Sequence, residues 1–254
     1  MSAIGLSVEF AQVQNAFSLH DKRILVVGAS GGIGRETARV LVSLGSAVVL
    51  VDRDEPSLLA TQLRNLGGVV ESAACDITNR PEVEALTTAV GELDGVVLLA
   101  GYCPWDDWTE NGWDATFARV IDVNLLGVIH VVRACLPRLV ARGNGRIVLV
   151  GSVAARMGGV KASPHYVAAK GGIASLVKWL ARKAAADGVL VNGVAPGVTD
   201  TPMTAGHGIS VEGVPLKRMA VPSEIAWPIA FLCSEAASYV CGTMLDVNGG
   251  LSMN

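Results

Sequence analysis

The chain has 254 residues, of which 51% are hydrophobic and 17% charged, and its formal net charge is −3. This composition excludes a disordered chain, which requires low hydrophobicity and high net charge. It also disfavours a nucleic-acid-binding protein, which usually carries a basic excess. The longest uncharged stretch has twelve residues, fewer than the ~20 that a membrane span requires. We therefore expect a globular protein that binds neither nucleic acid nor a membrane.

The N-terminus lacks the basic start, apolar core and cleavage site of a signal peptide. The five cysteines are widely spaced, with no C-x-x-C and no paired histidine, so we expect reduced thiols, a cytoplasmic location and no metal site. Residues 1–18 have weak periodicity and are predicted to form an N-terminal extension, either loosely held or an arm against another subunit. No linker-like segment divides residues 19–254, which predicts one domain.

Seven short runs rich in Val, Leu and Ile predict buried strands. These are Arg23–Gly28, Ala47–Asp52, Val69–Cys75, Gly95–Ala100, Arg146–Gly151, Val189–Ala195 and Thr243–Val247. Helices are predicted between them, at 32–44, 56–67, 79–91, 112–140, 164–186 and 222–236. The alternation predicts an α/β fold, a doubly wound parallel sheet of seven strands with helices on both faces.

A glycine-rich segment, G-A-S-G-G-I-G, follows the first predicted strand at residues 28–34. In this pattern Gly28 permits a tight turn, Gly32 lets the backbone approach a pyrophosphate, and Gly34 lets the next helix pack closely. The helix N-terminus then points its amide groups at the phosphates. The strand–turn–helix context therefore predicts a dinucleotide site; the alternative is an ordinary tight turn.

Asp52 ends the second predicted strand, eighteen residues after Gly34. A carboxylate at this spacing accepts hydrogen bonds from the adenosine ribose hydroxyls and repels a 2′-phosphate, which favours NAD. Arg53 keeps NADP possible, because a guanidinium group binds phosphate.

The segment Y-V-A-A-K places Tyr166 and Lys170 four residues apart, on one face of a predicted helix. A phenol of pKa ~10 is a poor base at neutral pH, and a nearby ammonium favours the phenolate. We therefore expect Tyr166 to exchange a proton with a substrate alcohol or ketone. Ser152 follows the fifth predicted strand, where ligands of such sheets bind, and its hydroxyl would hold the substrate oxygen.

Together these motifs resemble the short-chain dehydrogenase/reductase family. Further matches are Asp76 after the third strand, Asn124 in D-V-N-L-L-G, P-G-V-T-D-T at 196–201 and G-T-M-L-D-V-N-G-G at 242–250. The resemblance extends from about residue 18 to the end of the chain. It implies a Rossmann-like dinucleotide-binding and catalytic domain, hydride transfer at a nicotinamide, and a homodimer or homotetramer.

The resemblance also implies individual roles. Tyr166 would be the general acid/base, Lys170 would bind the nicotinamide ribose and lower the pKa of Tyr166, and Ser152 would orient the substrate oxygen. Asn124 would hold a water that links Lys170 to solvent. The expected cofactor-binding residues are Gly28, Ser30, Gly31, Gly32, Ile33, Gly34, Asp52, Arg53, Asp76, Ile77, Ala100, Gly101, Tyr166, Lys170, Pro196, Gly197, Val198 and Thr201.

Two positions depart from the family pattern. Leu98 and Leu99 stand where the family usually has two asparagines, and Val27 replaces a threonine before the first glycine. The missing polar groups put cofactor affinity or stability in doubt, although apolar residues suit a buried strand.

Residues 198–214 contain three glycines and are expected to form a lid over the nicotinamide. The candidates for the substrate pocket are Trp105, Trp108, Met157 and Met203, with His165 and His207 at its edges; general packing is the alternative for each. His165 adjoins Tyr166 and is expected to point away from the catalytic face. The possible basic contacts for an anionic substrate are Lys161, Lys217 and Arg218.

The preferred function is an NAD(H)-linked oxidoreductase of a small secondary alcohol or its ketone. Residues 215–226 and 245–250 most resemble the branch that holds 3-oxoacyl-carrier-protein reductases and bacterial secondary-alcohol dehydrogenases. An NADPH-dependent 3-oxoacyl reductase is therefore the first alternative. A catalytically silent cofactor-binding sensor or scaffold is a minor one, and a methyltransferase is disfavoured because it gives Tyr166 and Lys170 no role.

Overall fold

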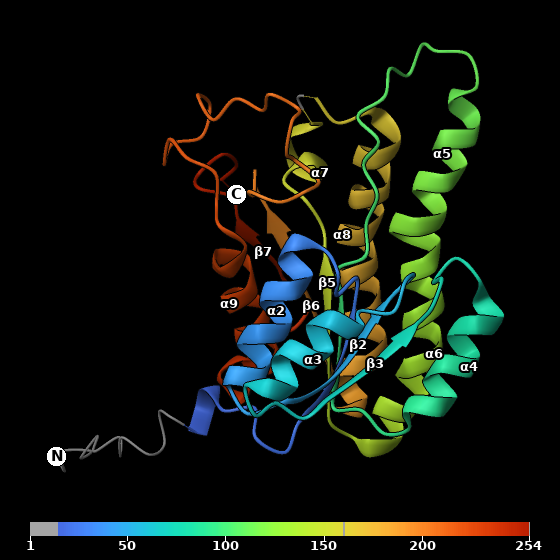
Figure 1. Ribbon diagram of the computed structural model, residues 1–254, viewed down its shortest axis with the longest axis vertical. Coiled ribbons are helices and arrows are strands. Elements are labelled where there is room, and N and C mark those ends of the chain that lie inside the picture. Colours follow the sequence, from blue (N-terminus) through green and yellow to red (C-terminus); the bar gives the residue numbers. More distant parts are fainter. Residues whose placement is uncertain (1–14, 160, 254) are drawn as a thin grey trace, which may run out of the picture.

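The computed structural model describes residues 15–159 and 161–253, which form a three-layer α/β structure around one sheet (Figure 1). The strands are β1 (Arg23–Val27), β2 (Ala47–Asp52), β3 (Val70–Ala74), β4 (Gly95–Leu98), β5 (Gly145–Val150), β6 (Val189–Pro196) and β7 (Met244–Val247). They pair in the order β3-β2-β1-β4-β5-β6-β7, and every pair is parallel. The predicted doubly wound parallel sheet is confirmed.

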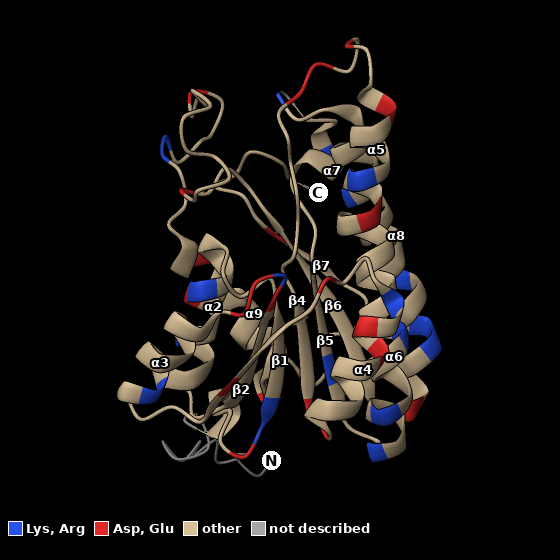
Figure 2. Cartoon of the chain, turned by 45° about the vertical axis from the view of Figure 1, so that its right-hand side comes forward, with Lys and Arg blue, Asp and Glu red and all other residues tan. Residues whose placement is uncertain are grey.

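Helices cover both faces of this sheet. They are α2 (Gly32–Ser43), α3 (Ser57–Asn65), α4 (Arg80–Val90), α5 (Trp113–Ile121), α6 (Gly127–Arg142), α7 (Ala154–Met157), α8 (Pro164–Ala184) and α9 (Pro222–Cys233). Figure 2 shows α2, α3 and α9 on one side of the sheet and α4, α6 and α8 on the other. Because β1 and β4 are neighbours whose following helices lie on opposite sides, the sheet has a switch point between them, where such folds bind ligands.

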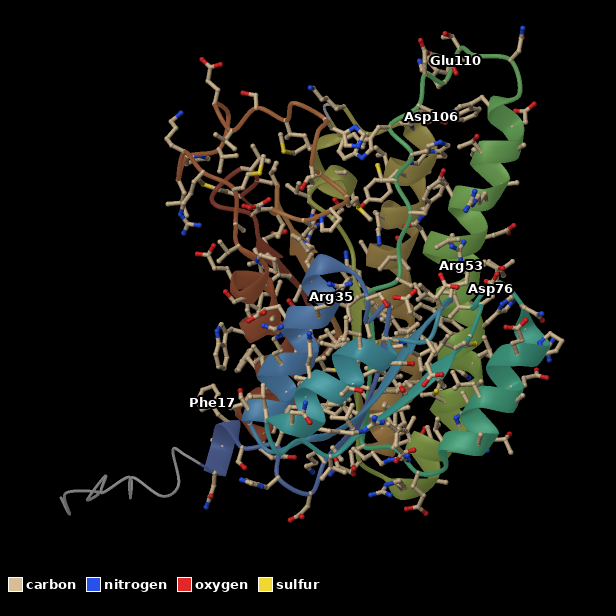
Figure 3. The ribbon with its side chains drawn as sticks, viewed as in Figure 1. Phe17, Arg35, Arg53, Asp76, Asp106 and Glu110 are labelled. Atoms are coloured by element: carbon tan, nitrogen blue, oxygen red, sulfur yellow. The ribbon has the colours of Figure 1, made fainter. Side chains whose placement is uncertain are left out.

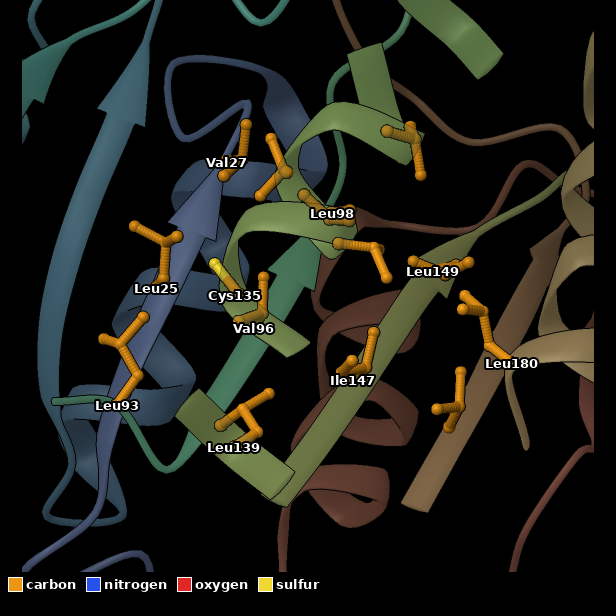
Figure 4. Packing of buried hydrophobic residues seen from close by; sticks show 14 of the residues in the cluster. Leu25, Val27, Leu93, Val96, Leu98, Cys135, Leu139, Ile147, Leu149 and Leu180 are labelled. Carbon is orange, nitrogen blue, oxygen red and sulfur yellow. The ribbon is translucent and has the colours of Figure 1, made fainter. Parts of the chain in front are cut away.

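Alternate residues of each strand enter two separate cores. Leu25 and Val27 belong to the cluster that packs against α4, α6 and α8 (Figure 4), whereas Ile24 and Val26 belong to the cluster under α2 and α9. This follows from the period of two in a strand. It explains why the strands read as continuous apolar runs, because both sheet faces are buried.

The predicted helix over 112–140 is interrupted in the structure. A π-helical turn, Asp122–Leu126, separates α5 from α6. Asn124 lies in this turn, and its Nδ2 donates to the carbonyl of Val120 at 2.9 Å. Most other element bounds lie within two residues of the prediction, but α7, a single turn after β5, was not predicted.

The run Trp113–Arg142 is long and apolar enough to cross a membrane, judged by length and composition. Its side chains Val128, Val131, Cys135 and Leu139, however, are buried in the core against the sheet. One face of α6 therefore packs in the core, and 39% of the most apolar window of the run is buried. The predicted N-terminal extension lies mostly outside the described residues; within them, Phe17 packs on Phe231 of α9 with ring centroids 6.4 Å apart.

Candidate active site

A groove runs along the C-terminal ends of the strands and consists of two adjoining cavities. The first cavity, of about 760 Å³, lies over β1, β2 and β3, and the second cavity, of about 610 Å³, lies over β5 and β6. The residues that line both are Ile33, Leu99, Gly101, Val150, Thr201 and Met203. Every residue predicted to bind the cofactor lines one cavity or the other.

The turn after β1 has a shape that only glycines permit. Gly28 has φ 85°, and a Cβ at this position would lie 2.4 Å from the backbone nitrogen of Ala100. A Cβ on Gly32 would lie 2.8 Å from the side chain of Thr201. The N-cap of α2, Gly31, makes no side-chain capping hydrogen bond, and the first turn of α2 has no acidic residue. This leaves the helix N-terminus suited to a phosphate group.

Asp52 holds this turn from the end of β2. Its Oδ2 accepts a hydrogen bond from the backbone N–H of Ser30 at 2.9 Å, and its Oδ1 accepts one from that of Arg53 at 2.8 Å. A carboxylate oxygen has further acceptor capacity, so Asp52 remains able to accept ribose hydroxyls. The Arg53 side chain is 65% exposed and lies 3.8 Å from a carboxylate oxygen of Asp54.

Two guanidinium groups, those of Arg53 and Arg119, line the first cavity, and Arg119 was not among the residues predicted from the sequence. Arg119 of α5 lines the cavity with its guanidinium 4.7 Å from the ring centroid of Tyr102. Asp76 accepts hydrogen bonds from the side chain and backbone of Thr78; these bonds, with smaller effects of Arg53 and Arg119, hold the pKa of Asp76 below its ordinary value. Figure 3 shows Arg53 and Asp76 close together, with Arg35 on α2.

Of the four predicted catalytic residues, Ser152, Tyr166 and Lys170 line the second cavity, and Asn124 does not. Lys170 Nζ donates to the carbonyl of Val150 at 2.9 Å and lies 5.7 Å from the ring centroid of Tyr166. Ser152 Oγ accepts the backbone N–H of Ala154 at 3.1 Å. The helix α8 supplies Tyr166 and Lys170 on one face, as their spacing predicts, and the end of β5 supplies Ser152.

Burial dominates the acid–base properties of this trio. It raises the pKa of Tyr166 above its ordinary value, and a hydrogen bond with Ser152 offsets this only in part. It lowers the pKa of Lys170 to about 8. Desolvation thus disfavours the phenolate in this structure. The expected lowering of the Tyr166 pKa by Lys170 stays a prediction.

Asn124 is fully buried beneath the trio. Both N–H groups of its amide are used on backbone carbonyls, of Tyr102 at 2.8 Å and Val120 at 2.9 Å, and its Oδ1 accepts the N–H of Tyr102 at 3.2 Å. A Cβ on Gly101 would lie 3.1 Å from Asn124 Oδ1 and 3.6 Å from Lys170 Nζ. Asn124 thus fixes the chain after β4 next to Lys170, with one oxygen lone pair left for a further donor.

The departures from the family pattern are accommodated by packing. Leu98 and Val27 are buried in the core between the sheet and α6. Leu99 packs against the opposite core, and its backbone N–H donates to the carbonyl of Val27 at 2.8 Å. The backbone course at Ala100 and Gly101 is therefore kept by strand pairing and apolar contacts.

The structure places only some of the predicted substrate residues around the second cavity. Trp105, Met157 and Met203 line it. His207 is not among the lining residues; it stacks on Trp105 with ring centroids 5.0 Å apart. Trp108 is 64% exposed and also lies off the cavity wall. Trp105 Nε1 donates to the carbonyl of Met203 at 2.9 Å, which joins the 102–112 loop to the lid segment 198–214.

A buried polar network, which sequence reasoning missed, anchors the 102–112 loop to α8. Ser163 Oγ donates to Asp106 Oδ1 at 2.6 Å, and the fully buried His165 lies 3.1 Å from Asp106 Oδ2 through Nε2. The backbone N–H of Tyr166 donates to His165 Nδ1 at 2.8 Å, so Nε2 carries the proton that His165 donates to Asp106. Figure 3 shows Asp106 on the loop that leads to α5, near the top of the view.

The charge of Asp106 is stabilised by this network. Burial alone would raise the pKa of its carboxyl, but the hydrogen bonds from Ser163 and His165 outweigh that effect, so the pKa lies below its ordinary value. His165 also stacks on Trp113 with ring centroids 5.1 Å apart. As expected, His165 does not line the second cavity. Its ring nitrogens instead join the backbone N–H of Tyr166 to the carboxylate of Asp106.

Comparisons with known proteins agree with this geometry. The model of a family described as enoyl-(acyl carrier protein) reductase matches residues 28–252. A cis-4-hydroxycyclohexanecarboxylate dehydrogenase of Sinomonas cyclohexanicum is 39% identical, over 89% of this chain and 94% of that protein. A 3-oxoacyl-(acyl-carrier-protein) reductase of Thermotoga maritima is 32% identical, over 92% and 98% respectively.

Solved structures show the same fold. A short-chain type dehydrogenase/reductase from Mycobacterium marinum has a TM-score of 0.89 at 27% identity and covers 95% of this chain and 100% of that one. A protein from Agrobacterium tumefaciens with bound NADP has a TM-score of 0.86 at 33% identity, over 93% and 98%. The chain belongs to the short-chain dehydrogenase/reductase family, whose members are oxidoreductases acting on hydroxyl and keto groups.

The nicotinamide dinucleotide of this family fits the groove. The glycines of the turn keep Cβ atoms out of the first cavity, the N-terminus of α2 is available to phosphate, and Asp52 is available to a ribose. The first cavity opens into the second cavity, where Tyr166 and Lys170 lie. An extended dinucleotide thus has a continuous path from Asp52 to Tyr166.

Proposed function

We propose that this protein transfers a hydride between a nicotinamide dinucleotide and a small secondary alcohol or its ketone. The observation that carries the proposal is that Ser152, Tyr166 and Lys170 line the cavity that continues the dinucleotide groove. A proton donor, a hydroxyl that can hold the substrate oxygen and a cation therefore converge where a carbinol carbon can meet the cofactor.

Each residue has a distinct part in this proposal. Ser152 holds the substrate oxygen, and Tyr166 accepts the alcohol proton in oxidation or donates it in reduction. The nicotinamide, when bound, accepts or supplies the hydride. Lys170 binds the ribose next to it, and its low pKa of about 8 lets it take part in proton exchange near neutral pH. Asn124 offers its remaining oxygen lone pair to a water that connects Lys170 to solvent.

For the cofactor we propose NAD(H). Asp52 supports this choice, because a carboxylate binds ribose hydroxyls and repels a 2′-phosphate. NADP(H) is the second candidate. It is favoured by Arg53 and Arg119, two guanidinium groups on the first cavity, and by the NADP in the structure from Agrobacterium tumefaciens.

For the substrate we propose a small alicyclic or aliphatic secondary alcohol. The second cavity supports this, since Trp105, Met157 and Met203 give it a largely apolar wall. The relative from Sinomonas cyclohexanicum, named for a cyclic hydroxycarboxylate, adds support. Reduction of a 3-oxoacyl thioester is the second candidate, favoured by the carrier-protein reductases among the relatives.

We also propose a homodimer or homotetramer in the cytoplasm. Large apolar side chains on the outer helices, Phe117, Leu126 and Trp179, are exposed on the single chain and would be buried by a second copy. All five cysteines are free thiols, in keeping with a reducing compartment. Light scattering at micromolar concentration tests the assembly.

The cofactor assignment is tested by titrating the protein separately with NADH and NADPH, following nicotinamide fluorescence. NADH should bind at least tenfold more tightly. Asp52→Asn keeps an oxygen acceptor for Ser30 but removes the charge, and should reduce the preference roughly tenfold, about the value of one charged hydrogen bond. Arg53→Ala should leave NADH binding unchanged. Preference for NADPH that is lost in Arg53→Ala would reverse the assignment and make thioester reduction the leading function.

A further inference from the structure

Lys161 places a positive charge on the wall of the second cavity, at its lid edge. This residue lies between α7 and α8 and lines the cavity. Its Nζ donates to the backbone carbonyls of His207 at 3.0 Å and Gly208 at 2.7 Å, both in the lid segment. These acceptors are neutral and take two of the three N–H groups, so one donor remains. Among the described residues, no carboxylate forms an ion pair with Lys161.

The other charged side chains on this wall have different settings. Lys170 is buried, bonded to Val150 and close to Tyr166, so it belongs to the catalytic trio. Glu212 is exposed and contributes its backbone carbonyl to a hydrogen bond from Lys217. Within the described part of the chain, Lys161 is therefore the lining cation that is free for a ligand.

The rest of the wall defines what lies between this cation and the catalytic hydroxyls. Trp105, Met157, Met203, Ile209 and Leu251 supply apolar surface to the same cavity. A molecule that fills it thus meets hydroxyl groups at the trio, apolar side chains along its length and an ammonium at the lid. An ammonium forms stronger, charge-assisted hydrogen bonds with a carboxylate than with a neutral acceptor.

We propose that Lys161 binds a carboxylate of the substrate, so that the substrate is a hydroxy acid, or its keto acid, with an apolar ring or chain between the two functional groups. This inference rests on the proposed alcohol oxidation. The chemistry balances as in the parent reaction: the carbinol loses a hydride to the nicotinamide and a proton to Tyr166, and the carboxylate is unchanged.

The alternative role for Lys161 is a latch that only holds the lid segment through His207 and Gly208. The two roles differ in their dependence on substrate charge. A latch affects every substrate alike, whereas a carboxylate-binding residue affects only the anionic one.

The test compares three alcohols with the same ring: cis-4-hydroxycyclohexanecarboxylate, its methyl ester and cyclohexanol. With saturating oxidised cofactor, the acid should exceed the ester at least tenfold in kcat/KM. Lys161→Met should lower kcat/KM for the acid ~10- to 100-fold, mainly through KM, as expected for a lost charged hydrogen bond, and leave both neutral alcohols within about twofold. Lys161→Arg should retain most of the preference, and Glu212→Gln, the matched control, should not reduce it.

A second readout does not depend on turnover. Cyclohexanecarboxylate has no hydroxyl and cannot react, but it should raise the melting temperature of the cofactor-bound wild type and not that of Lys161→Met. Equal losses on all three alcohols, or no stabilisation by cyclohexanecarboxylate, would overturn the inference even if cyclohexanol is oxidised. Failure to oxidise any alcohol, with the stabilisation intact, would instead count against the proposed function.

Discussion

The two halves of the groove are built differently. The first cavity contains the glycine turn that follows β1, whose backbone is held by hydrogen bonds such as Gly28 N–H to Val51 O at 2.8 Å. The second cavity is formed around the side chains of Ser152, Tyr166 and Lys170, and part of its wall comes from side chains of the 102–112 loop and the lid segment. The first half therefore requires particular backbone conformations, whereas the second half can change its ligand by changing side chains.

The two sides of the second cavity differ again. Asp106 ties the 102–112 loop to α8 through buried partners, Ser163 and His165. The lid segment is tied through backbone carbonyls that accept from Lys161 and Trp105. The first connection needs a charge with desolvated partners, so its loss is costly, whereas the second can be remade with water.

The largest expected effect in the second cavity is that of Ser152→Ala. Loss of a hydroxyl that holds the developing charge on the substrate oxygen should lower kcat about 10²- to 10³-fold. Ser152 also lowers the pKa of Tyr166, so its removal raises that pKa further and moves the rising limb of the oxidation pH profile to higher pH. Ser210→Ala, on the same wall, is the control and should change kcat less than threefold. Similar effects of both variants would contradict the assignment.

Gly32→Val tests the glycine turn of the first cavity. A Cβ at this position would lie 2.8 Å from the Thr201 side chain and fill the space for the phosphate. Cofactor binding should therefore weaken by roughly 50-fold, which corresponds to the usual cost of overpacking a well-packed site. Gly171→Ala has open space around its Cβ and should leave the affinity unchanged. Nicotinamide fluorescence measures both. Unaltered binding by Gly32→Val would show that the cofactor does not approach this turn.

Asp106→Ala removes the acceptor of two buried hydrogen bonds. His165 loses its acceptor, whereas the Ser163 hydroxyl keeps the backbone carbonyl of residue 106 as a partner at 2.6 Å. The free energy of unfolding should therefore fall by about 2 kcal/mol and the KM for the alcohol should rise, with the cofactor affinity retained. The side chain of Asp107 is exposed and accepts hydrogen bonds from Thr109, a near neighbour on the same loop, so Asp107→Ala serves as the matched control. Urea unfolding and steady-state kinetics read the two effects. Equal free energies of unfolding and equal KM values in the two variants would show that Asp106 does not hold the loop in place.

Lys170→Met tests how much the buried charge of Lys170 lowers the free energy of unfolding. Burial lowers the pKa of Lys170 from 10.5 to about 8, so below pH 8 the folded state carries a charge that it solvates poorly. The variant, although inactive, should be more stable than wild type by about 2 kcal/mol at pH 7. Because the folded wild type loses this proton before the unfolded chain does, the difference should shrink between pH 8 and 10.5. Urea unfolding at pH 7 and 10 measures this difference in the free energy of unfolding. A difference that is larger at pH 10 than at pH 7 would contradict the prediction.

The glycine turn of the first cavity and the Tyr166–Lys170 pair of the second cavity could be predicted from the sequence because their signals are local. The strands are continuous apolar runs, the glycine turn is contiguous, and Tyr166 and Lys170 share one helix face. The second half depends on contacts between distant positions. Asp106 lies 59 residues from His165, and Lys161 lies 46 residues from His207. No sequence motif predicts either contact. The π turn around Asn124 likewise depends on a side-chain bond to Val120 that helical periodicity does not encode.

The most direct test of the account compares wild type with Tyr166→Phe in two measurements on the same samples, NADH affinity by fluorescence and reduction of cyclohexanone. We predict that Tyr166→Phe binds NADH with the wild-type affinity within about twofold. Its turnover should fall by at least about 10²-fold, the usual contribution of a general acid. Turnover that survives in Tyr166→Phe would contradict the catalytic assignment. A wild type that binds NADH but reduces no ketone would favour a cofactor-binding sensor instead.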